Sequence, residues 1–111
     1  MSEYHHKDLK NALFRAALKL LDEQGVAAVT IRAVAREVGV SHTAYANHYR
    51  DRKDLLTAVA KAQFDYIQSW IDKRLENNSL TPSQRVEIFA QALFDFGIKY
   101  PNRYQLLWRG D

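Results

Sequence analysis

The chain has 111 residues, a formal net charge of +3 and no cysteine. This length suits one compact domain with a sizeable core and is too short for two ordinary ones. Without cysteine, a disulfide framework and a thiolate metal site are excluded. Because no apolar run approaches a membrane span and the amino terminus is too polar for a signal peptide, we expect a soluble, cytoplasmic protein with no membrane partner.

Residues 7–24 predict the first helix. Their apolar side chains recur at intervals of three and four residues, which places them on one helix face: Leu9, Leu13, Phe14, Ala17, Leu18 and Leu21. Gly25 follows as a C-terminal cap. We expect this helix to cover the next two helices from behind.

Residues 30–49 predict two short helices joined at a glycine. Thr30 is a suitable cap for the first, and Gly39 supplies the left-handed backbone that ends it. Ser41 caps the second helix, whose buried stripe is expected to be Val40, Ala44, Tyr45 and Tyr49. The residues then left to face outward are His42, Thr43, Asn47 and His48. This layout is typical of a helix-turn-helix DNA reader.

The chemistry of the same stretch agrees with DNA binding. Hydroxyl, imidazole and amide groups hydrogen-bond to base edges or phosphates. Residues 30–53 carry a net charge of +3, equal to that of the whole chain, from five basic and two acidic side chains: Arg32, Arg36, Arg50, Arg52 and Lys53 against Glu37 and Asp51. Two alternatives stay open, namely an ordinary pair of amphipathic helices and a solvated charged face.

The remainder of the chain is also predicted to be helical. Asp51 can cap a long helix that begins at Arg52 and continues until residues 77–79 break its apolar pattern. Thr81, Pro82 and Gln84 form a strong helix start with a capping box, and this helix is expected to reach about residue 99. A last short helix over residues 102–108 follows a proline. No stretch alternates with a period of two, so the expected fold class is all-α.

Catalytic and metal sites are not indicated. The histidines are two neighbours at the amino terminus, His5 and His6, and a pair six residues apart, His42 and His48, which lie on different helix faces and give no metal spacing. There is no glycine-rich phosphate loop, no cysteine nucleophile and no recognisable set of serine, histidine and acid. We therefore expect no enzyme activity, no metal and no cofactor.

From residue 9 to about residue 56 the chain resembles the DNA-binding domain of the tetracycline-repressor-like (TetR) family. The motifs that carry the resemblance are Asp22-Glu23-Gln24-Gly25, Thr30-Ile31, Val34-Ala35 before Gly39-Val40-Ser41, and His48-Tyr49 followed by Arg52-Lys53-Asp54-Leu55. Residues 100–108 are also similar to a tyrosine-proline segment in the regulatory domains of some members. The first match covers almost half of the chain.

The resemblance implies a division into a helix-turn-helix DNA-binding domain, residues 1–52, and a partial helical regulatory or dimerisation domain, residues 53–111. It implies a homodimer that binds a palindromic operator in double-stranded DNA, represses transcription, and releases DNA when an unknown small-molecule effector enters the regulatory domain. Nine of the thirteen aromatic residues lie beyond residue 60. The effector-pocket candidates are Phe64, Ile67, Trp70, Phe89, Phe96 and Tyr104.

Residue roles carried over from the family complete the expectation. Thr30 and Arg32 would meet the phosphate backbone at the start of the second helix. The candidates on the recognition helix are Ser41, His42 and Thr43 at its start and Tyr45, Asn47 and His48 further along. Arg52 and Lys53 would grip phosphate at the next helix start, where free N–H groups and a positive dipole end favour an anion.

Two residues depart from the family pattern. The family usually has tyrosine five residues after the serine, but this chain has Ala46 there and Tyr45 one residue earlier. Because one step along a helix is about 100° of rotation, Tyr45 is expected to pack in the core with its hydroxyl reaching the surface. The usual phosphate contact is then missing or comes from Asn47. Arg52 replaces a common lysine, which keeps the charge but changes the hydrogen-bond geometry.

The chain also ends early for this family, whose members run to nearly twice its length and dimerise through their last helices. We expect either a fragment or a short protein that dimerises differently or not at all. The alternative function is a truncated helical interaction protein that pairs with relatives and does not bind an operator by itself.

Overall fold

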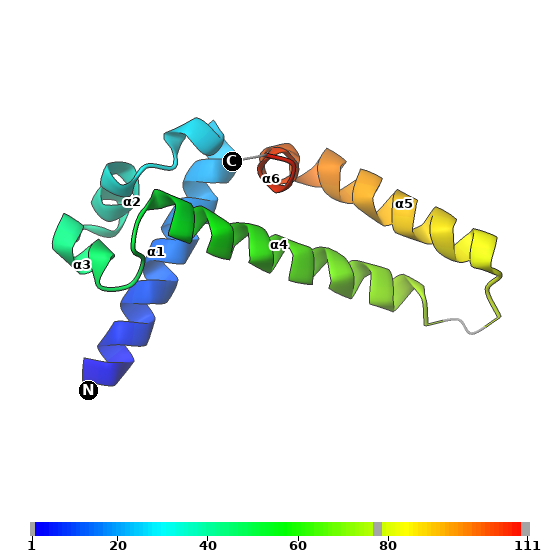
Figure 1. Cartoon of the computed structure of the whole chain (residues 1–111), viewed down its shortest axis with the longest axis horizontal. Helices are drawn as coiled ribbons and strands as arrows, with labels where there is room; N and C mark the ends of the chain where they lie inside the picture. Colours follow the sequence, from blue (N-terminus) through cyan, green and yellow to red (C-terminus); the bar gives the residue numbers. More distant parts are fainter. Residues whose placement is uncertain (1, 77–78, 110–111) are drawn as a thin grey trace. The chain divides into compact units, whose positions relative to one another are not determined.

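The computed structural model describes residues 2–76 and 79–109, with side chains from residue 8 onward, and every regular element in these ranges is helical (Figure 1). The α-helices are α1 (Ser2–Gln24), α2 (Ile31–Val38), α3 (His42–Ala46), α4 (Arg52–Arg74), α5 (Pro82–Lys99) and α6 (Pro101–Leu107), and η1 (Val26–Ala28) is a turn of 3₁₀ helix. The all-α prediction is confirmed. Within the described chain, none of the helices combines the length and the apolar character that a membrane crossing demands.

The chain packs as two compact units, Met1–Val59 and Ala60–Asp111. The boundary falls inside α4 and not at its first residue, because the first two turns of α4 bury Leu55 and Val59, each 1% exposed, within the first unit. The remainder of α4 joins α5 and α6 in the second unit.

The core of the first unit follows the predicted apolar stripe of α1. Leu13, Ala17 and Leu21 are fully buried, as is Val34 of α2. Helix α1 contacts α2, the first helix of the predicted pair, and η1. Burying such aliphatic side chains stabilises the unit by about 1.5–3 kcal/mol each.

The corner between α2 and α3 forms as the sequence predicts. The Thr30 hydroxyl accepts a hydrogen bond from the Ala33 amide at 3.0 Å, and Gly39 adopts the left-handed conformation with φ of 85°. The Gly39 and Val40 amides both donate to the Ala35 carbonyl, at 2.8 and 2.9 Å. Ser41 then caps α3 by accepting from the amide of Ala44 at 3.1 Å. These bonds fix the direction in which α3 leaves α2.

Helix α3 is shorter than predicted. It ends at Ala46, with Asn47 as its C-cap, although the sequence pattern continued to residue 49. Beyond the cap, the amides of His48 and Tyr49 both donate to the Tyr45 carbonyl, so the chain tightens into a turn. That turn keeps Tyr49 buried at 5% exposure, as the sequence predicted, although outside the helix.

The second unit has its own core. Ile67 and Ile71 of α4 pack with Ala92 and Phe96 of α5, and partly buried side chains surround them: Trp70, Leu75, Leu93, Tyr100, Tyr104 and Leu107. The predicted capping box of α5 is confirmed, because Thr81 and Gln84 exchange side-chain to backbone hydrogen bonds of 3.2 and 2.8 Å. Helix α4 ends at residue 74, and residues 77–78 of the predicted break lie outside the described residues.

Candidate nucleic-acid interface

Helix α3 has one polar edge and one buried tyrosine. Ser41, His42, Thr43 and Asn47 are exposed, whereas Tyr45 is 0% exposed. The Ser41 hydroxyl is already used as the cap. The exposed His42 ring is stacked on the Tyr45 ring at a centroid distance of 6.4 Å, and Thr43 is exposed next to it. The structure thus presents a polar helix edge at the position where a helix-turn-helix protein meets DNA.

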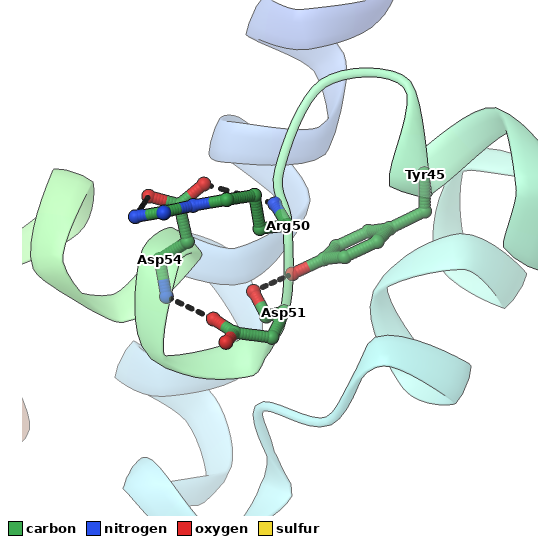
Figure 2. A network of polar contacts seen from close by, with 4 residues as sticks. All are labelled: Tyr45, Arg50, Asp51 and Asp54. Atoms are coloured by element: carbon green, nitrogen blue, oxygen red, sulfur yellow. Dashed lines mark hydrogen bonds and ion pairs between the residues drawn. The ribbon is translucent and has the colours of Figure 1, made fainter.

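Tyr45 supports this edge from behind. Its hydroxyl donates to the Asp51 carbonyl at 2.8 Å (Figure 2). Its ring centroid lies 5.9 Å from that of Tyr49. Burial raises the pKa of Tyr45 to about 12, with a further contribution from the Asp51 carboxylate, so the phenol stays a hydrogen-bond donor. The expected burial is confirmed. The hydroxyl does not reach the surface, however, and Tyr45 is removed from the DNA-contact candidates.

Two carboxylates occupy the start of α4. Asp51 caps the helix by accepting from the Asp54 amide at 2.8 Å, and Asp54 accepts from the Arg50 amide at 2.9 Å (Figure 2). Asp54 also lies 4.0 Å from the Arg50 guanidinium. The predicted cap at Asp51 is confirmed. Two cations at this end are exposed, Lys53 and Arg50, and the Arg50 side chain is 89% exposed.

Arg52 faces into the protein. Its Nε donates to the Val29 carbonyl at 2.7 Å and its Nη2 donates to the Val26 carbonyl at 2.9 Å. These bonds connect the start of α4 to both ends of η1, and the side chain is half-buried. The predicted phosphate grip of Arg52 is therefore replaced by an internal role. The change from the lysine common in the family matters, since one guanidinium reaches two carbonyls in a fixed geometry.

Replacing Arg52 by methionine should lower the free energy of unfolding by about 2 kcal/mol, because two backbone carbonyls lose charged donors. Urea denaturation followed by circular dichroism measures this. Lys53→Met removes the same charge from an exposed neighbour and should change stability by no more than about 0.5 kcal/mol. Equal losses from the two variants would show that Arg52 has no special structural role.

An open groove of about 570 Å³ lies between α2 and α3. Its apolar lining is Ile31, Ala35 and Val40, and its cationic or polar lining is Arg32, Arg36 and His42. Arg36 is not among the DNA contacts that were predicted from the sequence. The signal was present, because Arg36 lies four residues after Arg32 and therefore on the same helix face. The groove brings Arg32 and His42 together, as the DNA-binding hypothesis requires.

The three remaining DNA-contact candidates, Thr30, Asn47 and His48, differ in exposure. The hydroxyl of exposed Thr30 serves as the α2 cap, so a phosphate would share it with the Ala33 amide. Asn47 is exposed at the end of α3. His48 lies beyond the helix and is half-buried, so the expectation that it faces fully outward is wrong. Across the described residues, no three histidine, cysteine, aspartate or glutamate side chains gather as a possible metal site.

A glycine corner, a capped second helix with a polar edge, and basic residues beside it define a helix-turn-helix DNA-binding protein. Residues 13–59 match the family described as bacterial regulatory proteins, tetR family. This match confirms, over residues 13–59, the resemblance to the TetR family of transcriptional regulators that the sequence motifs indicated.

Two curated relatives agree. The chain is 44% identical over 52 residues to the tetracycline repressor protein class A from transposon 1721 of Escherichia coli, a match that covers 47% of this chain and 24% of the relative. It is 28% identical over 87 residues to the HTH-type transcriptional regulator BetI of Pectobacterium atrosepticum, strain SCRI 1043 / ATCC BAA-672, covering 78% of this chain and 45% of the relative. The chain thus spans less than half the length of either relative.

Proposed function

We propose that this chain is a sequence-specific repressor that binds a palindromic operator as a homodimer. The observation that carries the proposal is the exposed polar edge of α3, held against the domain by the buried Tyr45. A short rod with a fixed direction and free polar groups has the shape that a major groove admits. The residues assigned to base edges are His42 and Thr43 at the start of α3 and Asn47 at its end.

The phosphate contacts are assigned to the residues around that edge. Lys53 at the start of α4 and Arg32 and Arg36 beside the groove are exposed cations. Thr30 and Ser41 would contribute through their hydroxyl oxygens and neighbouring amides. Such contacts position a protein on duplex DNA without reading its sequence. His48 keeps a minor role in this proposal, because it is half-buried.

We assign operator binding to the first unit, which ends at Val59 and includes Lys53, and effector response and dimerisation to the second unit. Four effector candidates, Ile67, Trp70, Phe96 and Tyr104, pack in the core cluster of the second unit. Phe64 and Phe89 differ from them, since they are 51% and 50% exposed.

Electrophoretic mobility shift with duplexes selected from a random pool tests operator binding. Selected duplexes should bind more tightly than random duplex in the presence of nonspecific competitor. The logarithm of the affinity should also fall with the logarithm of salt concentration, with a slope of about −0.9 per neutralised phosphate. If selected and random duplexes bind equally, the chain is not a sequence-specific repressor.

A further inference from the structure

One face of the second unit combines aromatic rings with cations. We call this set, Tyr66, Trp70, Lys99, Tyr100 and Arg103, the cation–aromatic face. The Lys99 ammonium lies 5.8 Å from the Trp70 ring centroid and 5.4 Å from that of Tyr100. The Arg103 guanidinium lies 3.8 Å from the Tyr100 centroid. Two cations from α5 and α6 are thereby held over the same ring.

The rings of this face pack against one another. Tyr66 lies 5.4 Å from Trp70 in an edge-to-face arrangement and 6.1 Å from Tyr100, and Phe96 backs it at 6.3 Å. Tyr66 remains 38% exposed, and Trp70 and Tyr100 are half-buried. Contacts of this kind fix ring orientations. An aromatic surface whose rings stand at steep angles, 69° between Tyr66 and Trp70, is therefore present beside the two cations.

The electrostatics of the face favour negative charge. Hydrogen bonding with Tyr100 and then Trp70 lowers the pKa of Tyr66. Burial opposes this, and the charges of Lys99 and Arg103 add smaller lowering contributions. None of the influences on Tyr66 comes from a carboxylate. The nearby Asp95 is bound to Arg74 at 2.8 Å, so that charge is balanced at the margin of the face.

Contact with the face of a ring does not itself use the N–H donors of a cation. A guanidinium carries its N–H donors in its own plane, so stacking on Tyr100 does not use them, and Arg103 directs Nη1 to Gln63 at 3.1 Å. An ammonium over a ring can likewise donate to an acceptor on its other side. Lys99 and Arg103 already lie over the ring faces, so a cationic ligand would be repelled by them.

We propose that the cation–aromatic face binds a small carboxylate with a flat apolar body. Lys99 and Arg103 hold the carboxylate, and the apolar body lies against Tyr66 and Trp70. The proposal rests on the proposed repressor function only in calling this carboxylate the effector. The binding of the carboxylate to the face can be measured without DNA. A carboxylate gains two charge-assisted contacts, whereas its neutral amide loses both.

Isothermal titration calorimetry of the full chain with three probes tests the site. The ionised acid 2-naphthoate should bind about tenfold more tightly than the neutral 2-naphthamide, which keeps the same apolar body. Tetramethylammonium, a cation that suits aromatic rings, should not bind. Equal affinities for the acid and the amide, or tighter binding of the cation, would overturn the proposal.

Matched variants locate the site. Lys99→Gln should weaken 2-naphthoate about fivefold and leave 2-naphthamide unchanged, because it removes one charged contact. Arg85→Gln removes an exposed cation from the other end of α5 and should have no effect. Circular dichroism verifies that both variants are folded. If Lys99→Gln and Arg85→Gln behave alike, the carboxylate is bound elsewhere and the proposal fails.

The two proposals fail separately. Loss of carboxylate discrimination with intact operator binding would contradict the effector class alone. Carboxylate binding by a chain that does not distinguish selected from random duplex would contradict the proposed repressor function alone. A third readout joins them: 2-naphthoate should weaken operator binding by the wild-type chain more than by Lys99→Gln.

Discussion

Replacing Tyr45 by alanine should lower the free energy of unfolding by about 3–5 kcal/mol, which is a large part of the stability of a small domain. Tyr45 is the largest fully buried side chain, and its removal leaves a cavity behind α3. Tyr45→Phe keeps the ring and loses only the hydrogen bond to the Asp51 carbonyl, so it should cost about 1 kcal/mol. Urea denaturation measures both. Similar small losses from the two variants would mean that Tyr45 does not brace α3.

The same tyrosine should make stability depend on alkaline pH. Its folded pKa of about 12 lies above the ordinary tyrosine value of 10.0, so the folded state holds the proton more tightly than the unfolded state does. The contribution is complete below pH 10 and is lost as the pH rises from 10 towards 12. Wild-type stability should therefore fall over this range more steeply than that of Tyr45→Phe. Parallel curves for the two proteins would contradict the assignment.

The second large effect concerns operator recognition. Thr43→Ala and His42→Ala should each weaken binding to the selected duplex by about 1–3 kcal/mol and alter which base pairs are preferred. Lys53→Met should weaken binding to all duplexes similarly and make the salt slope about one unit shallower per half-site. Mobility shift titrations of the three variants on selected and random duplexes separate these roles.

Two controls keep this comparison interpretable. Lys61→Met removes an exposed cation from α4 in the second unit and should leave DNA affinity unchanged. Circular dichroism shows whether each variant is folded. If Thr43→Ala, His42→Ala and Lys53→Met weaken every duplex to the same degree, the division into base contacts and phosphate contacts is wrong.

Much of the first unit could be predicted because its signals are local. Caps at Thr30, Ser41 and Asp51 involve hydrogen bonds over three residues, and each forms as expected. The left-handed turn at Gly39 is also a property of a single residue. The apolar residues at intervals of three and four predicted the buried stripe of α1, because this spacing is a property of one helix and does not depend on the rest of the fold.

The errors arose where distant residues decide the outcome. From the sequence, the charge of Arg52 was predicted to contact phosphate. In the structure its partners are two carbonyls that lie 23 and 26 residues earlier in the chain. The end of α3 depends on the turn that buries Tyr49, whose hydroxyl lies 3.5 Å from the Lys10 carbonyl of α1. No pattern within α3 contains that information.

The effector candidates show the same limit. The sequence grouped six apolar residues of the second unit as one pocket, whereas the structure packs four in a core and exposes the two phenylalanines Phe64 and Phe89. Helical spacing alone cannot separate these cases, because α5 has apolar side chains around much of its circumference. The cation–aromatic face was also not predicted, because its rings come from α4 and from the α5–α6 junction, and only their packing brings Tyr66 within 6.1 Å of Tyr100.

Whether the polar edge of α3 lies in the major groove is measured most directly by dimethyl sulfate protection of the selected duplex. This reagent methylates guanine N7, an acceptor displayed in the major groove. Bound wild-type protein should protect guanines within each half-site, and His42→Ala or Thr43→Ala should restore methylation at those guanines in the bound duplex. Unprotected half-site guanines, in a complex that still forms, would contradict a major-groove position for α3.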